Sequence, residues 1–211
     1  MWPAISWAVL DYTGFRKLAW HAMKSAYQPR AIVVGRVDQG AQITLLNDLP
    51  DPWKTKVELS LIDKTGVVVK THTIDVNLDR YSVSRTPATE IFPEIADGNY
   101  EGFILATCPE VRASRRTTLA PAKESPLHDL TAKTAIANGV LKVQVTANTY
   151  IHELSFMPEI LALGTQVDAQ IVSLLPGQNH TFVVTGAAND LAEIAKRVED
   201  LLWSHNRIVN Q

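Results

Sequence analysis

The sequence of 211 residues has little of several features that would point directly to a class of function. It holds one cysteine, Cys108, so no internal disulfide can form, and this favours a reducing compartment. Its 20 basic and 22 acidic side chains nearly balance, which argues against the positive footprint of nucleic-acid or anionic-membrane binding. No apolar run approaches the roughly 20 residues that span a bilayer, and no signal-peptide pattern opens the chain. We therefore predict a cytoplasmic protein with neither nucleic-acid nor membrane partners.

Motifs that perform catalysis or hold cofactors are also missing. The sequence contains no glycine-rich phosphate loop, no Gly-x-Ser-x-Gly elbow and no zinc-type histidine pair on a helix. Cys108 stands at the end of an expected strand, where the common role is that of a small core residue. None of the six histidines has a partner at metal-ligand spacing; they are His21, His72, His128, His152, His180 and His205. We predict no catalytic residue, no metal site and no cofactor in this chain.

From Pro29 onward the sequence has a series of short runs in which apolar and polar residues alternate. Residues 56–62 show this pattern clearly, with Val57, Leu59 and Leu61 on one face. The next four residues, 63–66, have the composition of a hairpin turn. Seven or eight such runs, without a helical period among them, predict an antiparallel immunoglobulin-like β-sandwich over residues 30–121.

A second, smaller immunoglobulin-like sandwich is predicted over residues 122–211, after a linker that contains two prolines. Asn138-Gly139 is its strongest hairpin signal. From Leu191 the apolar spacing becomes helical, and Asp190 with Glu193 predicts a capping box at the start of a C-terminal helix. The predicted fold class is therefore mainly β, with two tandem sandwiches and a C-terminal helix.

Residues 1–29 differ from the rest. A strand-like run at 4–10 leads into a turn at 11–14 and then into a helical pattern that Pro29 ends. Six aromatic residues crowd into this segment: Trp2, Trp7, Tyr12, Phe15, Trp20 and Tyr27. One strand and one helix cannot bury both their faces, so we expect the segment to be poorly ordered, or to cover itself with the first sandwich or a second copy of the chain. Because the C–H faces of sugars stack on indole rings, Trp2 is a candidate sugar-binding residue.

Short motifs follow one another through this opening: Met1-Trp2-Pro3, Ser6-Trp7, Asp11-Tyr12-Thr13-Gly14 and Lys17. In this order they resemble the last strand and helix of the catalytic barrel in family 2 glycoside hydrolases, most closely the β-mannosidases. The resemblance implies that residues 1–29 are a remnant strand–helix unit of a (β/α)8 barrel, ahead of the two sandwiches. It also implies a parent enzyme that removes terminal, non-reducing β-D-mannose residues with retention of configuration, in which Trp2 lines the subsite of the terminal mannose.

Catalytic activity is not expected from this chain alone. A retaining glycosidase needs two carboxylates about 5 Å apart, one as acid/base and one as nucleophile. The resemblance places both on barrel strands upstream of Trp2. The chain then represents a C-terminal fragment that buttresses the upstream barrel, which is its expected partner, and the β-mannoside substrate binds only in the parent.

Other interpretations remain open at this stage. The sandwiches could form a carbohydrate-binding module, for which Trp53, after Pro52, is the candidate sugar contact. Tandem immunoglobulin-like domains with a purely structural or adhesive role would account for residues 31–211 but not for the aromatic opening. Within family 2, the parent could instead be a β-galactosidase, a β-glucuronidase or an exo-β-glucosaminidase.

Overall fold

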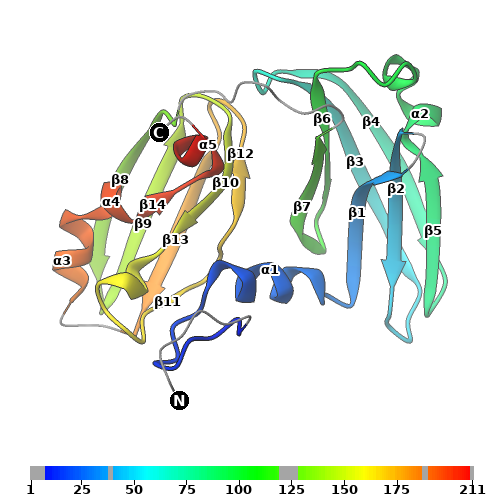
Figure 1. Cartoon of the computed structure of the whole chain (residues 1–211). Coiled ribbons are helices and arrows are strands. Elements are labelled where there is room, and N and C mark those ends of the chain that lie inside the picture. The colour runs from blue at the N-terminus through cyan, green and yellow to red at the C-terminus, as the bar shows by residue number, and fades with distance from the viewer. Residues whose placement is uncertain (1–7, 38–39, 119–127, 187–189, 210–211) are drawn as a thin grey trace. The chain divides into compact units, whose positions relative to one another are not determined.

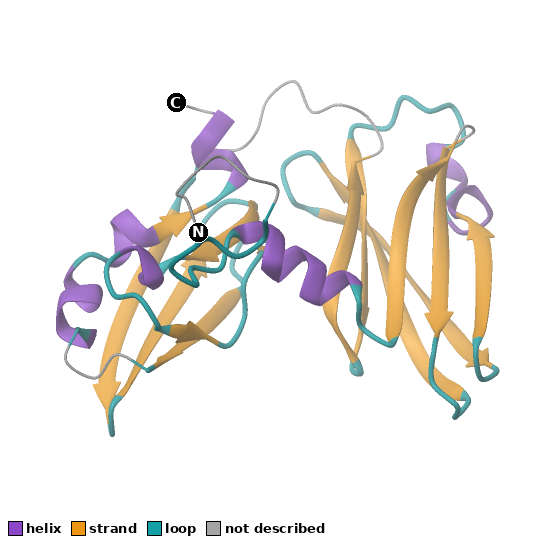
Figure 2. Cartoon of the chain, turned by 60° about the horizontal axis from the view of Figure 1, so that its bottom comes forward, coloured by secondary structure: helices purple, strands orange, loops and turns teal. Residues whose placement is uncertain are grey.

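The computed structural model describes residues 8–37, 40–118, 128–186 and 190–209. The chain is mainly β, as predicted, and every strand pairing within these ranges is antiparallel (Figures 1 and 2). It divides into two compact units, one of residues 26–125 and one that joins residues 1–25 to residues 126–211. We call them the central unit and the C-terminal unit. Within the described residues, no helix is long and apolar enough to cross a membrane.

Two sheets form the central unit. The three-stranded sheet has the order β1-β2-β5, and its strands are β1 (Arg30–Val37), β2 (Gly40–Asn47) and β5 (Ser82–Pro87). The four-stranded sheet has the order β4-β3-β6-β7, and its strands are β3 (Trp53–Asp63), β4 (Val68–Leu78), β6 (Gly102–Cys108) and β7 (Val111–Thr118). Two antiparallel sheets of this size constitute the predicted sandwich.

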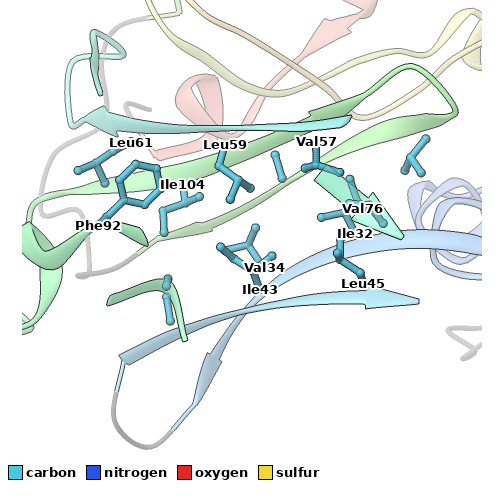
Figure 3. Packing of buried hydrophobic residues seen from close by; sticks show 14 of the residues in the cluster. Ile32, Val34, Ile43, Leu45, Val57, Leu59, Leu61, Val76, Phe92 and Ile104 are labelled. Carbon is cyan, nitrogen blue, oxygen red and sulfur yellow. The ribbon is translucent and has the colours of Figure 1, made fainter. Parts of the chain in front are cut away.

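The core of the central unit follows the alternation seen in the sequence (Figure 3). Val57, Leu59 and Leu61 on β3 are all 0% exposed, and they face Ile32 and Ile43 on the other sheet. Each buried aliphatic side chain contributes about 1.5–3 kcal/mol relative to an exposed one. The period-2 pattern of residues 56–62 therefore identified both the strand and its buried face.

Residues 30–121 were predicted to contain no helix, and this prediction was wrong. A short helix, α2 (Ala88–Ile91), and a 3-10 turn, η1 (Pro93–Ile95), follow β5. Ala88 and Phe92 are 0% exposed and pack against the core. Elements this short are too brief to show a helical period, and they form because their apolar residues fill the space beyond the sheets.

The C-terminal unit also has two sheets. One has the order β11-β13-β9-β8, with β8 (Leu130–Ala137), β9 (Val140–Ala147), β11 (Gln166–Val167) and β13 (Asn179–Thr185). The other has the order β12-β10-β14, with β10 (Ile151–Phe156), β12 (Val172–Leu174) and β14 (Leu202–Trp203); a 3-10 turn, η2 (Pro158–Ile160), follows β10. Asn138 and Gly139 join β8 to β9 with φ values of 51° and 71°, which confirms the predicted hairpin turn.

The helical period from Leu191 does produce helix, but in pieces. They are α3 (Leu191–Lys196), α4 (Val198–Leu201) and, beyond β14, α5 (His205–Val209). Arg197 lies between the first two, and Leu202 leaves the helix to pair with Phe156. Asp190 makes no side-chain capping bond, so the predicted capping box does not form. Where a continuous helix would have passed through Leu202 and Trp203, these residues instead form backbone hydrogen bonds with β10.

Candidate functional site

Of the predicted site residues, Trp2 lies outside the described part of the chain. The described opening begins with a tight turn whose centre is Asp11. The Asp11 Oδ1 accepts hydrogen bonds from Thr13 N at 2.8 Å, Thr13 Oγ1 at 2.6 Å and Phe15 N at 2.9 Å. These bonds, the hydrogen bond from the Thr13 side chain most of all, lower the pKa of Asp11 although slight burial acts to raise it. A carboxylate oxygen engaged in three local bonds is part of the backbone architecture of the turn.

The same turn occurs a second time. Asp63 Oδ1 accepts from Thr65 N at 2.8 Å, Thr65 Oγ1 at 2.7 Å and Val67 N at 3.0 Å. Gly14 and Gly66 occupy matching positions, with φ values of 90° and 92° that a residue with a Cβ adopts at a cost. The Asp-x-Thr-Gly motif therefore forms the same hydrogen-bonded turn at both places where it occurs. The motif in the opening is explained by turn geometry, without a catalytic role.

The opening is attached to the C-terminal unit by Arg16 and Glu159. Arg16 N donates to Glu159 Oε2 at 3.3 Å, and Arg16 Nη1 donates to Glu159 Oε1 at 3.1 Å. Both side chains are largely buried, at 29% and 11% exposure. The sequence predicted that this segment would be poorly ordered, or would lie on the first sandwich or on a second copy; its described residues instead contact the second sandwich. No local pattern pointed to this, because the two residues are 143 positions apart.

Next to this ion pair lies a small cleft, lined by Phe15, Leu18, His21, Met157 and Gln170 among others. Its internal volume of about 20 Å³ has room for roughly one water molecule. It is therefore too small to hold a sugar ring. Burial lowers the pKa of His21, as do, to a smaller degree, the positive charges of Arg16 and Lys24, so its imidazole is neutral at pH 7.

The helix after the turn, α1 (Leu18–Ala26), has no buried residue. Two cations lie near the ring of Trp20, with Arg16 Cζ 5.1 Å and Lys24 Nζ 5.5 Å from its centroid. Leu18 and Met23 are 38% and 43% exposed. A helix of nine residues without a fully buried residue is only marginally stable by itself.

Trp53 is not the surface residue that the sequence suggested. It is the first residue of β3 and is 1% exposed, inside the core of the central unit. The guanidinium of Arg30 lies 5.9 Å from the centroid of its ring, and Nε1 has no hydrogen-bond partner within the described structure. Pro52 precedes a strand here, and the indole fills the sandwich interior. A ring buried to this extent has no face free for a sugar.

Cys108, predicted to be a small core residue, is the last residue of β6 and packs only partly buried against the core of the central unit. Its Sγ donates to Glu110 Oε2 at 2.8 Å, and Thr55 Oγ1 donates to the same oxygen at 2.7 Å. Burial, and then the hydrogen bond to Glu110, raise the pKa of the Cys108 thiol. A thiol that is harder to ionise is a weak nucleophile. In the described ranges, no group of three or more histidine, cysteine or acidic side chains is arranged to hold a metal ion.

The fold is thus that of two antiparallel sandwiches preceded by a turn and a helix that the second sandwich holds. No family model and no curated protein matches the chain. Among solved structures it is similar to a β-D-mannosidase from Dictyoglomus thermophilum, with a TM-score of 0.67, 14% sequence identity and coverage of 97% of this chain and 24% of that one. It is also similar to an exo-chitosanase from Amycolatopsis orientalis, with a TM-score of 0.57, 12% identity and coverage of 90% and 27%.

Both of these enzymes are family 2 glycoside hydrolases. At 14% and 12% identity the comparison establishes the fold, and the chain spans about a quarter of the length of either enzyme. The resemblance to a portion of a family 2 glycoside hydrolase, which the motifs of the opening predicted, is confirmed at the level of the fold.

Proposed function

We propose that this chain is the C-terminal accessory region of a β-mannosidase-like glycoside hydrolase. The parent enzyme removes terminal, non-reducing β-D-mannose residues with retention. One observation carries most of the weight: the match to the Dictyoglomus enzyme covers 97% of the chain, so that it takes in the turn and helix of the opening as well as both sandwiches. The single cysteine is consistent with a cytoplasmic enzyme.

The role of the region follows from how its opening is held. If residues 1–29 are the last strand and helix of a barrel, the bonds between Arg16 and Glu159 fix that barrel element to the C-terminal sandwich. The exposed side chains of α1 are then available to the preceding barrel, which would be the partner of this region. Trp2, a few residues before the turn, is the proposed wall of the subsite for the terminal mannose.

Activity assays test this function directly. The 211-residue chain should release no product from p-nitrophenyl β-D-mannopyranoside, because on the resemblance both catalytic carboxylates lie on upstream strands. The chain extended by its upstream reading frame should release product, and Trp2→Ala in that longer enzyme should weaken substrate binding. Turnover by the 211-residue chain, or an upstream frame without a carboxylate-bearing barrel, would overturn the proposed function.

The similarity to an exo-chitosanase supports a second candidate, a parent that removes β-D-glucosamine. Assaying the extended enzyme on the matching p-nitrophenyl β-D-glucosaminide, β-D-galactoside and β-D-glucuronide distinguishes the specificities. Higher kcat/KM on the glucosaminide than on the mannoside would replace the first assignment with the second.

A further inference from the structure

One end of the central unit is held rigid by the buried side chain of Asn47, which is 0% exposed. Its Nδ2 donates to the carbonyl oxygens of Asp51 at 2.8 Å and Asp79 at 2.9 Å, and its Oδ1 accepts from Arg30 Nε at 3.2 Å. The backbone continues this connection, since Asp48 N donates to Pro29 O at 2.8 Å and Tyr81 N donates to Leu49 O at 3.3 Å. We call residues 27–30, 47–53 and 79–82 the Asn47 end. Three separate segments are thereby fixed to one another before any ligand arrives.

Two tyrosines stand out from this end. Tyr27 is 79% exposed and Tyr81 is 67% exposed. In the described structure the large exposed apolar side chains include three aromatic ones, Tyr12, Tyr27 and Tyr81, and two of the three are here. Single exposed aromatics are ordinary on a protein surface. These two project from segments that the hydrogen bonds to Pro29 and Leu49 tie to one another, and each offers a flat, partly apolar ring on which a ligand can stack.

The backbone of Tyr81 is unusual as well. Its φ of 50° is in the left-handed region, where a bulky residue costs about 1 kcal/mol or more. Tyr81 lies in the connection from β4 to β5, which crosses from one sheet of the central unit to the other. Because the ring of Tyr81 is exposed, no burial offsets the strain. An exposed tyrosine at a position where glycine would relieve strain indicates that its ring has a use.

Charge indicates which kind of molecule fits. The Asn47 end carries three carboxylates, on Asp48, Asp51 and Asp79, all on exposed residues. The same end has two guanidinium groups, those of Arg30 and Arg80. The guanidinium of Arg30 already donates hydrogen bonds to the carbonyl oxygens of Asp51 and Pro52. Stacking surfaces for single-stranded nucleic acid lie in strongly basic grooves, which this is not. Carboxylates accept hydrogen bonds from hydroxyl groups, and aromatic faces attract the C–H face of a pyranose ring.

We propose that the Asn47 end binds a neutral hexopyranose oligosaccharide, with sugar rings stacked on Tyr27 and Tyr81 and their hydroxyl groups donating to the neighbouring carboxylates. This site does not depend on the proposed enzymatic parent. Trp53, the sugar contact that the sequence suggested, belongs to the same end but lies beneath the guanidinium of Arg30.

Calorimetric titration of the 211-residue chain with mannohexaose and with cellohexaose tests the site. We expect saturable binding of at least one of them. Tyr81→Ala and Tyr27→Ala should each lower the association constant by about tenfold, as expected for the loss of one stacked ring. Tyr12→Ala is the matched control, since Tyr12 is 55% exposed but belongs to the C-terminal unit, and it should leave binding unchanged.

Tyr81→Gly separates loss of binding from loss of folding. Glycine adopts the left-handed conformation without a steric cost, so this variant should unfold at a higher denaturant concentration than the wild type and yet bind the oligosaccharide as weakly as Tyr81→Ala. Three results would overturn the proposal: no binding of either sugar up to roughly millimolar concentration, unchanged binding in both tyrosine variants, or tighter binding of a single-stranded oligonucleotide than of either sugar. None of them would affect the enzymatic assignment, which depends on the activity assays.

Discussion

Arg16 binds both oxygens of the Glu159 carboxylate, one through its backbone N–H and the other through its guanidinium. The two residues are 143 positions apart, and their bonds join the turn of the opening to the turn that follows β10. Since α1 has no buried residue, these bonds are a principal attachment of the segment to the described fold. Together with the cleft in which Phe15, Leu18 and His21 meet Met157 and Gln170, they make the turn and the start of the helix part of the C-terminal unit.

Removing the guanidinium should loosen this attachment without unfolding the sandwiches. Arg16→Ala leaves a carboxylate that is only 11% exposed with a single donor, which costs about 2 kcal/mol. We expect amide hydrogen exchange over residues 9–26 to accelerate by about 30-fold, while amides of β9 keep their protection. Lys56→Ala is a suitable control, because it breaks an ion pair with Asp75 whose partners are 75% and 85% exposed. Equal exchange over residues 9–26 in wild type and Arg16→Ala would show that other contacts hold the segment.

The two Asp-x-Thr-Gly turns allow a matched comparison. Asp63→Ala removes the acceptor of three hydrogen bonds in the hairpin between β3 and β4, and should lower the free energy of unfolding of the central unit by about 1–2 kcal/mol. Asp11→Ala removes the same bonds from a segment whose helix has no fully buried residue, so it should increase local exchange with little effect on global unfolding. Urea titration of both variants measures this difference. A larger loss for Asp11→Ala than for Asp63→Ala would contradict it.

Local sequence patterns predicted the parts of the fold that local interactions determine. The alternation of Val57, Leu59 and Leu61 identified a strand and its buried face, and Asn138-Gly139 identified a hairpin, because both depend on neighbours along the chain. The helical period from Leu191 correctly predicted helix, but it did not predict where the helix ends. Leu202 and Trp203 form the two-residue strand β14, which pairs with β10 about 46 residues earlier in the chain. Pairing between distant strands leaves no mark within a window of ten residues.

The candidate site was harder to predict for the same reason. Trp53 follows Asp51-Pro52, a composition typical of a loop, and nothing local shows that its ring points into a sandwich. Tyr81 gave no signal, because a left-handed backbone is expected at glycine or asparagine and not at tyrosine. Glu159 has no sequence pattern that connects it to Arg16. The resemblance to a known family contributed most to the prediction of the fold. The order of its motifs along the chain can be recognised even where contacts between distant residues cannot be inferred.

Mild acid should weaken the C-terminal unit before the central one. Burial lowers the pKa of both His128 and His180 in this unit, below the usual value of 6.5. Below pH 6.5 the unfolded chain therefore binds more protons than the folded one. The contribution of these two histidines to the free energy of unfolding is complete above pH 6.5 and declines as the pH falls towards 5. Carboxylates with lowered pKa values, such as that of Asp63, lose their contribution only at more acidic pH. The window between pH 7 and pH 5 thus isolates the histidines.

Urea titrations at pH 7 and pH 5 should show this loss in the transition of the C-terminal unit. His180→Phe removes a half-buried imidazole that already packs edge-on against Phe182, at 4.6 Å between ring centroids, and should reduce the difference between the two pH values. His72→Gln changes the one histidine of the central unit, on exposed β4, and should leave that difference unchanged. A central unit that weakens more than its neighbour over this window would contradict the assignment.

Cys108 should react slowly with thiol reagents, and its neighbour Glu110 is part of the reason. Burial and the hydrogen bond donated to Glu110 both raise the pKa of the thiol, so little thiolate is present at neutral pH. Glu110→Gln removes the negative charge beside the sulfur and should increase the rate of alkylation by iodoacetamide at pH 7.5 several-fold, with a matching shift of the rate–pH profile to lower pH. Glu90→Gln, an exposed change on α2 in the same unit, serves as the control and should leave the rate unaltered. If both variants accelerate alkylation equally, a general loosening of the central unit is the cause; if neither does, burial alone sets the reactivity of the thiol.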